Sequence, residues 1–267
     1  MNINFSNKPV IACVHLLPTP GTHLYDGDID KIYMTAISDA KIFLKYKVDA
    51  LIIENFRDRP FYPAEVPVET TAMIAGVARE IVNIADIPVG IAVLRNDAAA
   101  ALAIATAVKA NFIRINVHVG AVLAEQGIVY GNSHHTLRLR ANLKSNVAIF
   151  SDVAVKHSNP FVYKNISQEV RDASDHSEAI IVSGEKTGIE TDPQNLLDAK
   201  KATRKPVLIG SGVTPDNIHN VFEAADGFIV GSYFKKEGIG KALVEETRVK
   251  VFMEKIHSLR NSLVTTG

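Results

Sequence analysis

Cysteine is almost absent from this chain, which has a single one, Cys13, among 267 residues. One cysteine cannot form a disulfide within the chain, so we expect a protein of a reducing compartment such as the cytoplasm. Net charge is absent too, because 29 lysines and arginines balance 29 aspartates and glutamates. Proteins that bind nucleic acid usually carry a basic surplus, so the composition argues against that class of partner.

Long apolar runs are also absent. The most apolar helical segment lies between Asp97 and Lys109, and it is shorter than the roughly 20 residues that a transmembrane helix needs. Residues 1–17 lack the basic start, apolar stretch and small-residue cleavage site of a secretory signal, so we interpret them as a strand. We therefore expect a soluble protein without a transmembrane segment, while peripheral contact with a membrane stays open.

Short apolar runs alternate with helical periodicity along the whole chain. Buried parallel strands are short and almost uniformly apolar, whereas the helices that cover them place apolar residues at a 3.6-residue spacing. Strands are predicted over residues 10–16, 50–54, 89–94, 112–117, 147–153, 179–182, 207–209 and 227–230. Helices are predicted over residues 30–46, 68–85, 97–109, 133–143, 167–176, 192–203, 215–224 and 241–262.

This alternation predicts an α/β fold, a (β/α)8 TIM barrel. No glycine-, serine- or proline-rich linker divides the chain, so we expect one domain over residues 1–267. The alternative is an open doubly wound sheet, which keeps its phosphate-binding glycines in a GxGxxG pattern after the first strand. Here the first strand runs into CVHLLP at residues 13–18, without that pattern, and the barrel is favoured.

Glycine-serine turns follow the last two predicted strands. Such turns leave backbone N–H groups accessible, and a helix that follows adds partial positive charge. In a TIM barrel this place is the usual phosphate site. A Gly-Ser pair can also form an ordinary tight turn. That alternative is weaker here, because Gly-Ser pairs follow two consecutive predicted strands. The predicted phosphate-binding residues, including two glycines after the sixth strand, are Gly184, Gly188, Gly210, Ser211, Gly212, Gly231 and Ser232.

Polar side chains also stand where other strands end. The carboxyl ends of the strands form the active-site face of a TIM barrel. Residues two apart on a strand point the same way, so Arg114, Asn116 and His118 are expected to share a face. The predicted catalytic residues are Glu54, Asn116, Asp152 and Lys156. The predicted substrate-binding residues are His15, Asn96, Arg114 and His157.

These residue types can position a sugar-like substrate and move its protons. Glu54 stands out because the apolar run before it would carry it into the barrel, where an unpaired carboxylate is costly. Lys156 could attack a carbonyl as an amine if burial lowers its pKa. Structural alternatives remain open: an internal ion pair of Arg114 with Asp152, a hydrogen-bonded core role for His15, and a solvated Lys156.

A metal requirement is left open by the sequence. Glu54, Asn116 and Asp152 could supply oxygen ligands for Mg²⁺. The chain has no HxH or HExxH pattern, so a zinc site is not expected. The adjacent His134 and His135 point different ways on a helix and make a poor metal pair.

Two long segments follow the first and fourth predicted strands, over residues 17–28 and 118–132. Long loops at this end of a barrel usually serve function, often as lids over the site. They could instead form the contact of a homo-oligomer, and the oligomeric state stays open.

Several blocks of the chain resemble the BtpA family. They include VHLLPTPG at residues 14–21, FIRINVHVGA at 112–121, FSDVAVKHS at 150–158 and VLIGSGVTPDNI at 207–218. The resemblance implies a TIM barrel of the ribulose-phosphate-binding type. Its founding member is associated with photosystem I biogenesis as a peripheral thylakoid membrane protein, and a bacterial relative occurs among sugar-uptake genes. The resemblance brings no assigned reaction with it.

Two functions compete on these grounds. The first is an enzyme that binds a small phosphorylated metabolite, a sugar phosphate, and performs isomerase- or lyase-type carbon-acid chemistry; a sensor of such a metabolite is a weaker variant. The second is a non-catalytic factor that stabilises a membrane complex such as photosystem I. That factor would need an exposed apolar or basic patch. The candidate basic residues are Lys235, Lys236, Lys250, Lys255 and Arg260.

Overall fold

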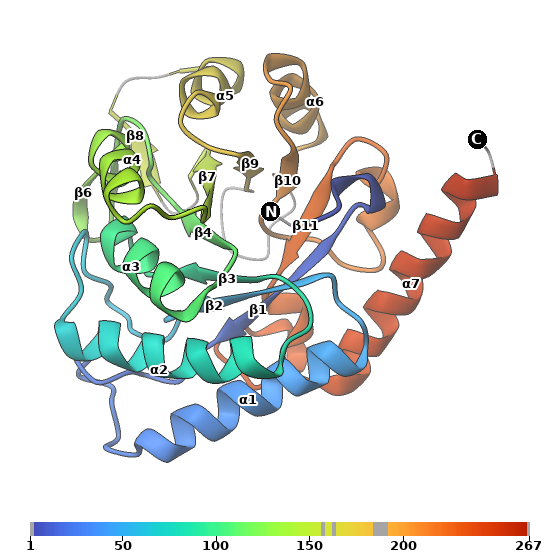
Figure 1. Ribbon diagram of the computed structural model, residues 1–267. Helices are drawn as coiled ribbons and strands as arrows, with labels where there is room; N and C mark the ends of the chain where they lie inside the picture. Colours follow the sequence, from blue (N-terminus) through green and yellow to red (C-terminus); the bar gives the residue numbers. More distant parts are fainter. Residues whose placement is uncertain (1–2, 156–157, 162–163, 184–191, 266–267) are drawn as a thin grey trace.

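The central element is a closed barrel of eight parallel strands, shown in Figure 1. The computed structural model describes residues 3–155, 158–161, 164–183 and 192–265. The barrel strands follow one another in chain order, and β1 pairs with both β2 and β11, which closes the ring. They are β1 (Val10–His15), β2 (Ala50–Glu54), β3 (Val89–Ala92), β4 (Phe112–Ile115), β7 (Ala148–Val153), β9 (Ala179–Val182), β10 (Val207–Ile209) and β11 (Gly227–Val230). All eight predicted strands, and the TIM-barrel fold, are confirmed.

Helices surround the barrel and cover the outer faces of its strands (Figure 1). In the described part of the chain they are α1 (Ile29–Lys45), α2 (Val68–Ile84), α3 (Ala98–Val108), α4 (Ser133–Asn142), α5 (Ile166–Ser174), α6 (Pro193–Ala202) and α7 (Glu246–Thr265). Outward-facing strand residues such as Val10 and Val14 join the apolar stripes of these helices, for example Phe43 of α1, in one large buried core. Burial of this layer supplies the main driving force for the fold.

The prediction of a helix over residues 215–224 is wrong. Only a short 3-10 turn, η2 (Ile218–Asn220), is present there. The side chain of Asn217 explains the difference, because its Oδ1 accepts from the N–H of Thr214 and its Nδ2 donates to the carbonyl of Gly212. These side-chain bonds compete with the helical hydrogen-bond pattern.

The last helix, predicted over residues 241–262, begins later, at Glu246. The residues before it fold back, because the N–H of Lys236 donates to the carbonyl of Leu243 over 2.9 Å. Gly238 has a φ of 72°, which is a conformation that favours glycine. This fold-back brings the carbonyl of Gly240 to the carboxyl end of β1.

The barrel interior changes from apolar to polar along its axis. Phe112 and Phe150 stack inside it with ring centroids 4.6 Å apart, and Phe5 of the N-terminal segment lies 6.2 Å from Phe150. These rings fill the interior toward the amino ends of the strands. The next inward residues along β4 and β7 are polar, namely Arg114 and Asp152. The polar layer therefore lies at the carboxyl ends.

A second sheet of three antiparallel strands is built from the chain segments after β4 and β7. Its strands are β5 (Ala121–Ala124), β6 (Gly127–Tyr130) and β8 (Ser158–Pro160). The segment predicted as a long loop over residues 118–132 is thus mostly a hairpin, and β8 pairs with its first strand. Two neighbouring segments at the carboxyl end are joined in this way.

Among the described residues, no helix combines the length and the apolar character needed to cross a membrane. The sequence offers no obvious polybasic cluster, and two of the five basic residues considered for membrane contact are buried or partly buried. Lys235 is completely buried, and its Nζ donates to the carbonyl of Cys13 over 3.0 Å. Arg260 is partly buried and donates from Nη2 to Oδ2 of Asp49 over 2.6 Å. Two of the five cations thus serve the protein interior.

Candidate functional site

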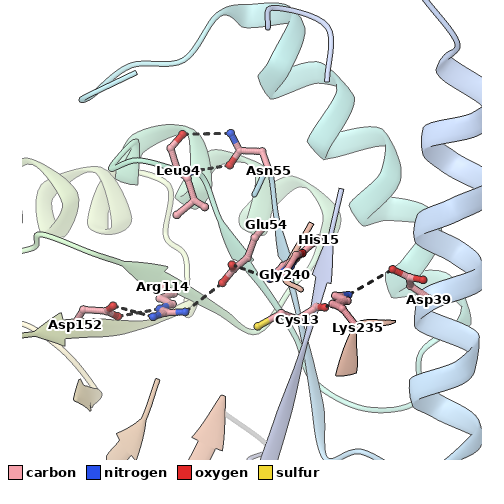
Figure 2. Close-up of polar contacts among 10 residues, drawn as sticks. All are labelled: Cys13, His15, Asp39, Glu54, Asn55, Leu94, Arg114, Asp152, Lys235 and Gly240. Carbon is pink, nitrogen blue, oxygen red and sulfur yellow. Dashed lines mark hydrogen bonds and ion pairs between the residues drawn. The ribbon is translucent and has the colours of Figure 1, made fainter. Parts of the chain in front are cut away.

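Polar side chains converge on the inner face of the barrel at the carboxyl ends of four strands. His15 ends β1, Glu54 ends β2, Arg114 lies on β4 and Asp152 lies on β7. His15 and Glu54 are direct partners in the register of β1 with β2, so they point to the same side. Figure 2 shows Arg114 between the carboxylates of Asp152 and Glu54. All four side chains are buried.

Arg114 and Asp152 form a bidentate ion pair. Nε of Arg114 donates to Oδ1 of Asp152 over 2.9 Å, and Nη2 donates to Oδ2 over 2.8 Å. Burial by itself would lower the pKa of Arg114, but the carboxylates of Asp152 and Glu54 outweigh it and raise that pKa. Nδ2 of Asn116 also donates to Oδ2 of Asp152. Asp152 therefore holds Arg114 and Asn116 in place, and the Arg114–Asp152 ion pair that the sequence left open is present. The catalytic role of Asp152 stays a prediction.

The two carboxylate oxygens of Glu54 have different neighbours, the guanidinium of Arg114 and the imidazole of His15. Nη1 of Arg114 donates to Oε1 over 3.3 Å, and Nε2 of His15 lies 3.6 Å from Oε2. The other ring nitrogen of His15, Nδ1, donates to the carbonyl of Gly240 over 2.9 Å, because a carbonyl oxygen can only accept. In neutral His15 the unprotonated nitrogen, Nε2, therefore faces Glu54. The imidazole stacks on the ring of Phe56 at 4.1 Å, which fixes its plane.

Two buried oxygens near this network have no hydrogen-bond partner among the described residues. They are Oδ1 of Asn116 and Oγ of Ser183, which directly follows β9. A Cβ added to Gly210 would lie 2.6 Å from Oγ of Ser183 and 3.2 Å from Nη2 of Arg114. Buried polar atoms are normally paired. These two oxygens are therefore candidates to bind a ligand at the barrel mouth.

The glycines after β10 and β11 keep the barrel mouth open. A Cβ on Gly210 would collide with Cγ2 of Ile181 at 2.5 Å, and one on Gly231 would press on Nε2 of His15 at 3.1 Å. Larger residues at these two positions would fill the mouth. Side chains are thus excluded where the predicted phosphate turns meet the polar network.

Backbone hydrogen bonds limit which of the predicted phosphate-binding N–H groups can bind an anion. The N–H of Gly210 donates to the carbonyl of Val182 over 2.8 Å, so it belongs to the barrel ladder. No acceptor among the described residues takes the N–H groups of Gly212 and Ser232. Ser211 is buried beside them. Both turns lie in the described part of the chain, and no α-helix begins directly at them, because the first helical elements after the two strands are η2 and the 3-10 turn η3 (Ser232–Phe234).

Four of the predicted site residues lie outside the described residues. They are Lys156, His157, Gly184 and Gly188. Along the chain they come after the last residues of β7 and β9, which are Val153 and Val182. Their roles remain predictions from the sequence.

Asn96, predicted to bind substrate, is engaged by the backbone instead. Its Nδ2 donates to the carbonyls of Val117 and Tyr130 over 2.8 and 3.0 Å. Its Oδ1 accepts from the N–H of Val117 over 2.8 Å. The whole amide is therefore used to tie the exit of β4 to the end of β6, and Asn96 is a positioning residue.

His118 is predicted to share an inward face with Arg114 and Asn116, and this is wrong. Strand β4 ends at Ile115, so the alternation of an extended chain does not continue to His118. Its Nε2 lies 3.1 Å from the carbonyl oxygen of His176. Burial lowers the pKa of His118 to about 4, so the ring is neutral at pH 7.

The predicted site residues do not include Cys13, Arg95 or Gly240, which the structure adds to the mouth. Cys13 lies two residues before His15 on β1, and this spacing is the signal that could have found it. Arg95 is buried; burial lowers its pKa, and the charge of Asp152 acts to raise it. Gly240 comes from a distant loop and is found only through its contact with His15.

A cavity of about 990 Å³ opens beside Asn116 and Asp152. Its described walls include Val122 and Pro160 of the small sheet and Glu169 of α5. Burial raises the pKa of Glu169. The segment over residues 118–132, predicted as a lid, thus supplies one wall of a space that reaches the polar network.

The oxygen ligands predicted for Mg²⁺ do not surround a common point. The guanidinium of Arg114 lies between Glu54 and Asp152 and is paired with both. Asn116 turns its Nδ2 rather than its Oδ1 toward Asp152. A cationic side chain therefore stands where the metal ion is predicted, and this set of residues does not fit Mg²⁺.

Two solved structures resemble this chain in fold alone. Thiamine phosphate pyrophosphorylase from Pyrococcus furiosus has a TM-score of 0.60 at 11% identity, and the match covers 96% of this chain and 98% of that one. N-(5'-phosphoribosyl)anthranilate isomerase from Pyrococcus furiosus has a TM-score of 0.57 at 14% identity, with coverage of 94% and 99%. At such low identity the likeness shows the shared barrel and nothing about activity.

Similarity in sequence is much stronger. The photosystem I biogenesis protein BtpA of Synechocystis is 40% identical over 255 residues, which covers 93% of this chain and 88% of that protein. An uncharacterised protein of Pyrococcus horikoshii is 40% identical over 260 residues, with coverage of 97% and 99%. The conserved pattern of the BtpA family matches residues 6–258. The chain therefore belongs to the BtpA family.

Proposed function

We propose that this chain is an enzyme that binds a small phosphorylated metabolite, such as a sugar phosphate, and performs isomerase- or lyase-type chemistry at a carbon next to a carbonyl. One observation carries the proposal. Glu54 is buried at the carboxyl end of β2, with Oε1 3.3 Å from Nη1 of Arg114 and Oε2 3.6 Å from Nε2 of His15. TIM-barrel active sites lie at that end, and a carboxylate placed there is suited to taking a proton from carbon.

The substrate class is supported by the turns after β10 and β11. Gly210 and Gly231 exclude side chains from the mouth, and the N–H groups of Gly212 and Ser232 point to no acceptor in the described part of the chain. Backbone N–H groups of this kind bind anions. The names of the two solved structures above contain the words phosphate and phosphoribosyl, but at their low identity they add only a fold analogy.

The proposed reaction depends on a negative charge that forms on the carbonyl oxygen of the substrate. Glu54 removes the proton from carbon, the C–H electron pair moves toward the carbonyl oxygen, and the positive charge of Arg114 stabilises the enolate. Oδ1 of Asn116 and Oγ of Ser183 orient substrate hydroxyl groups. Return of the proton to the former carbonyl carbon, with transfer of the hydroxyl proton from the neighbouring carbon to the carbonyl oxygen, gives an isomer. In the lyase alternative Glu54 removes the proton of the β-hydroxyl group instead, a new carbonyl forms there as the C–C bond breaks, and Arg114 stabilises the enolate that is released. Lys156 is the candidate electrophile that the sequence adds.

Glu54→Gln tests the catalytic half of this proposal. A metabolite pull-down with mass spectrometry first identifies the ligand, and we expect a phosphorylated sugar on both the parent chain and the variant. Turnover of that compound should fall by roughly 10²- to 10⁴-fold in the variant, as for loss of a general base. Glu80→Gln, at an exposed position of α2, is the matched control. Full turnover by Glu54→Gln would overturn the proposed role.

Ser232→Asp tests the phosphate half. A carboxylate beside the predicted anion site should repel the phosphate and weaken binding of the identified compound by at least about tenfold, which corresponds to roughly 1.4 kcal/mol. Isothermal titration measures the affinity. Unchanged binding by this variant would place the phosphate elsewhere.

A second candidate function is favoured by one observation, the name of the 40% identical Synechocystis relative, a photosystem I biogenesis protein. A factor of that kind acts through its surface and does not need Glu54 as a base. Expression of the parent chain and of Glu54→Gln in a Synechocystis strain without its own BtpA separates the two functions. Equal recovery of photosystem I with both proteins supports the non-catalytic function, and recovery with the parent chain alone supports the enzyme.

A further inference from the structure

Three potential metal ligands meet inside the barrel below the mouth. Cys13 and His15 stand two residues apart on β1, so they face the same side, and Glu54 is the register partner of His15 on β2. One ligand atom from each residue lies within 4.8 Å of the other two. Figure 2 shows the three side chains on neighbouring strands with Sγ of Cys13 directed into the interior. All three are buried.

The spacing of these atoms approaches that of a tetrahedral site. Ligands at about 2.0–2.3 Å from a zinc ion lie roughly 3.3–3.8 Å from one another. Nε2 of His15 and Oε2 of Glu54 are already 3.6 Å apart. A small inward movement of the Cys13 side chain completes the set, since its sulfur lies within 4.8 Å of both.

The hydrogen bonds around the cluster match those of metal ligands. A histidine that binds a metal through one ring nitrogen usually donates from the other to a carbonyl or carboxylate, which fixes its orientation. Nδ1 of His15 donates to the carbonyl of Gly240 over 2.9 Å and leaves Nε2 toward the cluster. The second oxygen of Glu54, Oε1, accepts from Nη1 of Arg114, which orients Oε2. Both ligands are therefore pre-positioned.

Gly231 leaves space beside the ligand atoms. A Cβ at this position would lie 3.1 Å from Nε2 of His15 and 3.4 Å from Sγ of Cys13. Any side chain there would press on two of the three ligand atoms at once. A site with three protein ligands and space beside them has the composition of a catalytic zinc centre, whose fourth position takes water or substrate.

We infer that Cys13, His15 and Glu54 form a binding site for a divalent cation that prefers thiolate and imidazole ligands, with Zn²⁺ as its representative. Thiolate and imidazole select such ions over Mg²⁺. The ion displaces the thiol proton of Cys13 to solvent, and the two anionic ligands balance its charge. A search for HxH and HExxH motifs does not find this site. Its pattern is Cys-x-His on one strand, and the third ligand is a glutamate on the neighbouring strand.

This site shares Glu54 with the proposed function and changes the role of that residue from free base to ligand. A bound ion would make Glu54 a ligand, and the cation itself could then polarise a carbonyl oxygen. The experiments below measure metal binding alone. A chain that binds no metal could still bind a phosphorylated substrate, and a chain that binds metal could fail to bind one.

The first experiment measures metal on the full chain. The protein is stripped with a chelator, dialysed against Zn²⁺ or Co²⁺, and analysed by plasma mass spectrometry and absorption spectroscopy. We expect one equivalent of metal per chain and, with Co²⁺, the charge-transfer band of a thiolate ligand. Zn²⁺ should also raise the melting temperature, because it binds the folded state. Stoichiometric Co²⁺ without a thiolate band, or no bound metal, would overturn the inference.

Variants assign the ligands. Cys13→Ala and His15→Gln should each weaken Zn²⁺ binding by more than the roughly 10- to 100-fold that loss of an outer hydrogen-bond partner causes. Gly231→Ala should weaken it without removing a ligand. His118→Gln, which changes another buried histidine, is the matched control and should bind as the parent does. Circular dichroism of each metal-free variant confirms folding, and a folded Cys13→Ala chain with parental affinity would also overturn the inference.

Discussion

Arg114 is the residue on which the barrel mouth depends. Its guanidinium is buried among strands, where a charge is tolerated only when it is paired. Asp152 accepts two of its hydrogen bonds and Glu54 accepts a third. Removal of one partner leaves an uncompensated charge in the interior, which costs more than the intact pair contributes.

Asp152→Asn should therefore lower the free energy of unfolding by roughly 3–5 kcal/mol, the usual cost of breaking a buried ion pair. The amide keeps the shape of the carboxylate and removes its charge. Urea unfolding followed by circular dichroism measures the change. Asp86→Asn, at an exposed position after α2, should change the same quantity by less than about 0.5 kcal/mol. Equal stability of the two variants would show that Arg114 does not need Asp152.

His118 should make the stability depend on pH. Burial lowers its pKa to about 4 in the folded chain, below the ordinary value of 6.5. Above pH 6.5 the ring is neutral in both states. As the pH falls from 6.5 toward 4, the unfolded chain binds the proton first, and stability is lost. His118→Gln should remove this part of the pH dependence.

The measurement compares urea unfolding of the parent chain and of His118→Gln at a neutral pH and at about pH 5, within the window that the shifted pKa defines. The difference between the two pH values should be smaller in the variant. The same difference in both proteins would mean that His118 carries its proton equally well in the folded and unfolded states.

The polar residues of the mouth could be placed from the sequence, and the ion pair of Arg114 with Asp152 was one of its alternatives, but the sequence could not choose among those alternatives. Strand alternation is regular up to Ile115 and Val153, so Arg114 and Asp152 could be assigned to the inner face. That Asp152 pairs with Arg114 and leaves Glu54 beside His15 depends on distances across the barrel. Such distances are set by packing of strands that are remote in sequence.

At the scale of elements, the strands were predictable because each is a short apolar run buried on both faces. The run over Ala50–Glu54 shows this pattern clearly. Prediction failed where side chains or glycine override periodicity. Asn217 replaces helical hydrogen bonds with its own, and Gly127, with a φ of 93°, turns the segment after β4 into a hairpin. Both effects are local and invisible to a 3.6-residue pattern.

Asp97 should contribute more to stability than an ordinary helix cap. Its Oδ1 accepts from the N–H of Ala100 at the start of α3, and its Oδ2 accepts from the N–H of Val66. Asp97→Ala removes both bonds and should cost roughly 2–3 kcal/mol. Asp28→Ala, which removes only the exposed cap of α1, should cost about 1 kcal/mol. Chemical denaturation compares the two variants, and equal losses would mean that the bond to Val66 contributes nothing.

At the scale of the whole molecule, the polar mouth is supported by an apolar base. Phe112, Phe150 and Phe5 fill the interior toward the amino ends of the strands. The base carries no group that the proposed chemistry uses. Stability and function should therefore separate along the barrel axis.

Phe150→Ala tests this separation. The variant should lose roughly 3–5 kcal/mol of unfolding free energy, because a fully buried ring leaves a cavity. Phe161→Ala, at a side chain 57% exposed, should lose less than about 0.5 kcal/mol. Thermal unfolding gives the stability of both variants. A loss for Phe150→Ala no larger than for Phe161→Ala would show that the base is not needed.

The pairing of β1 with β11 has a consequence for synthesis of the chain. These two strands come from opposite ends of the sequence, so a nascent polypeptide cannot seal its barrel until Val230 has left the ribosome. Until that moment β1 has an exposed edge that can recruit strands from other chains. Translation that stops before β11 should therefore yield aggregates, whereas a completed chain hides the same edge within itself.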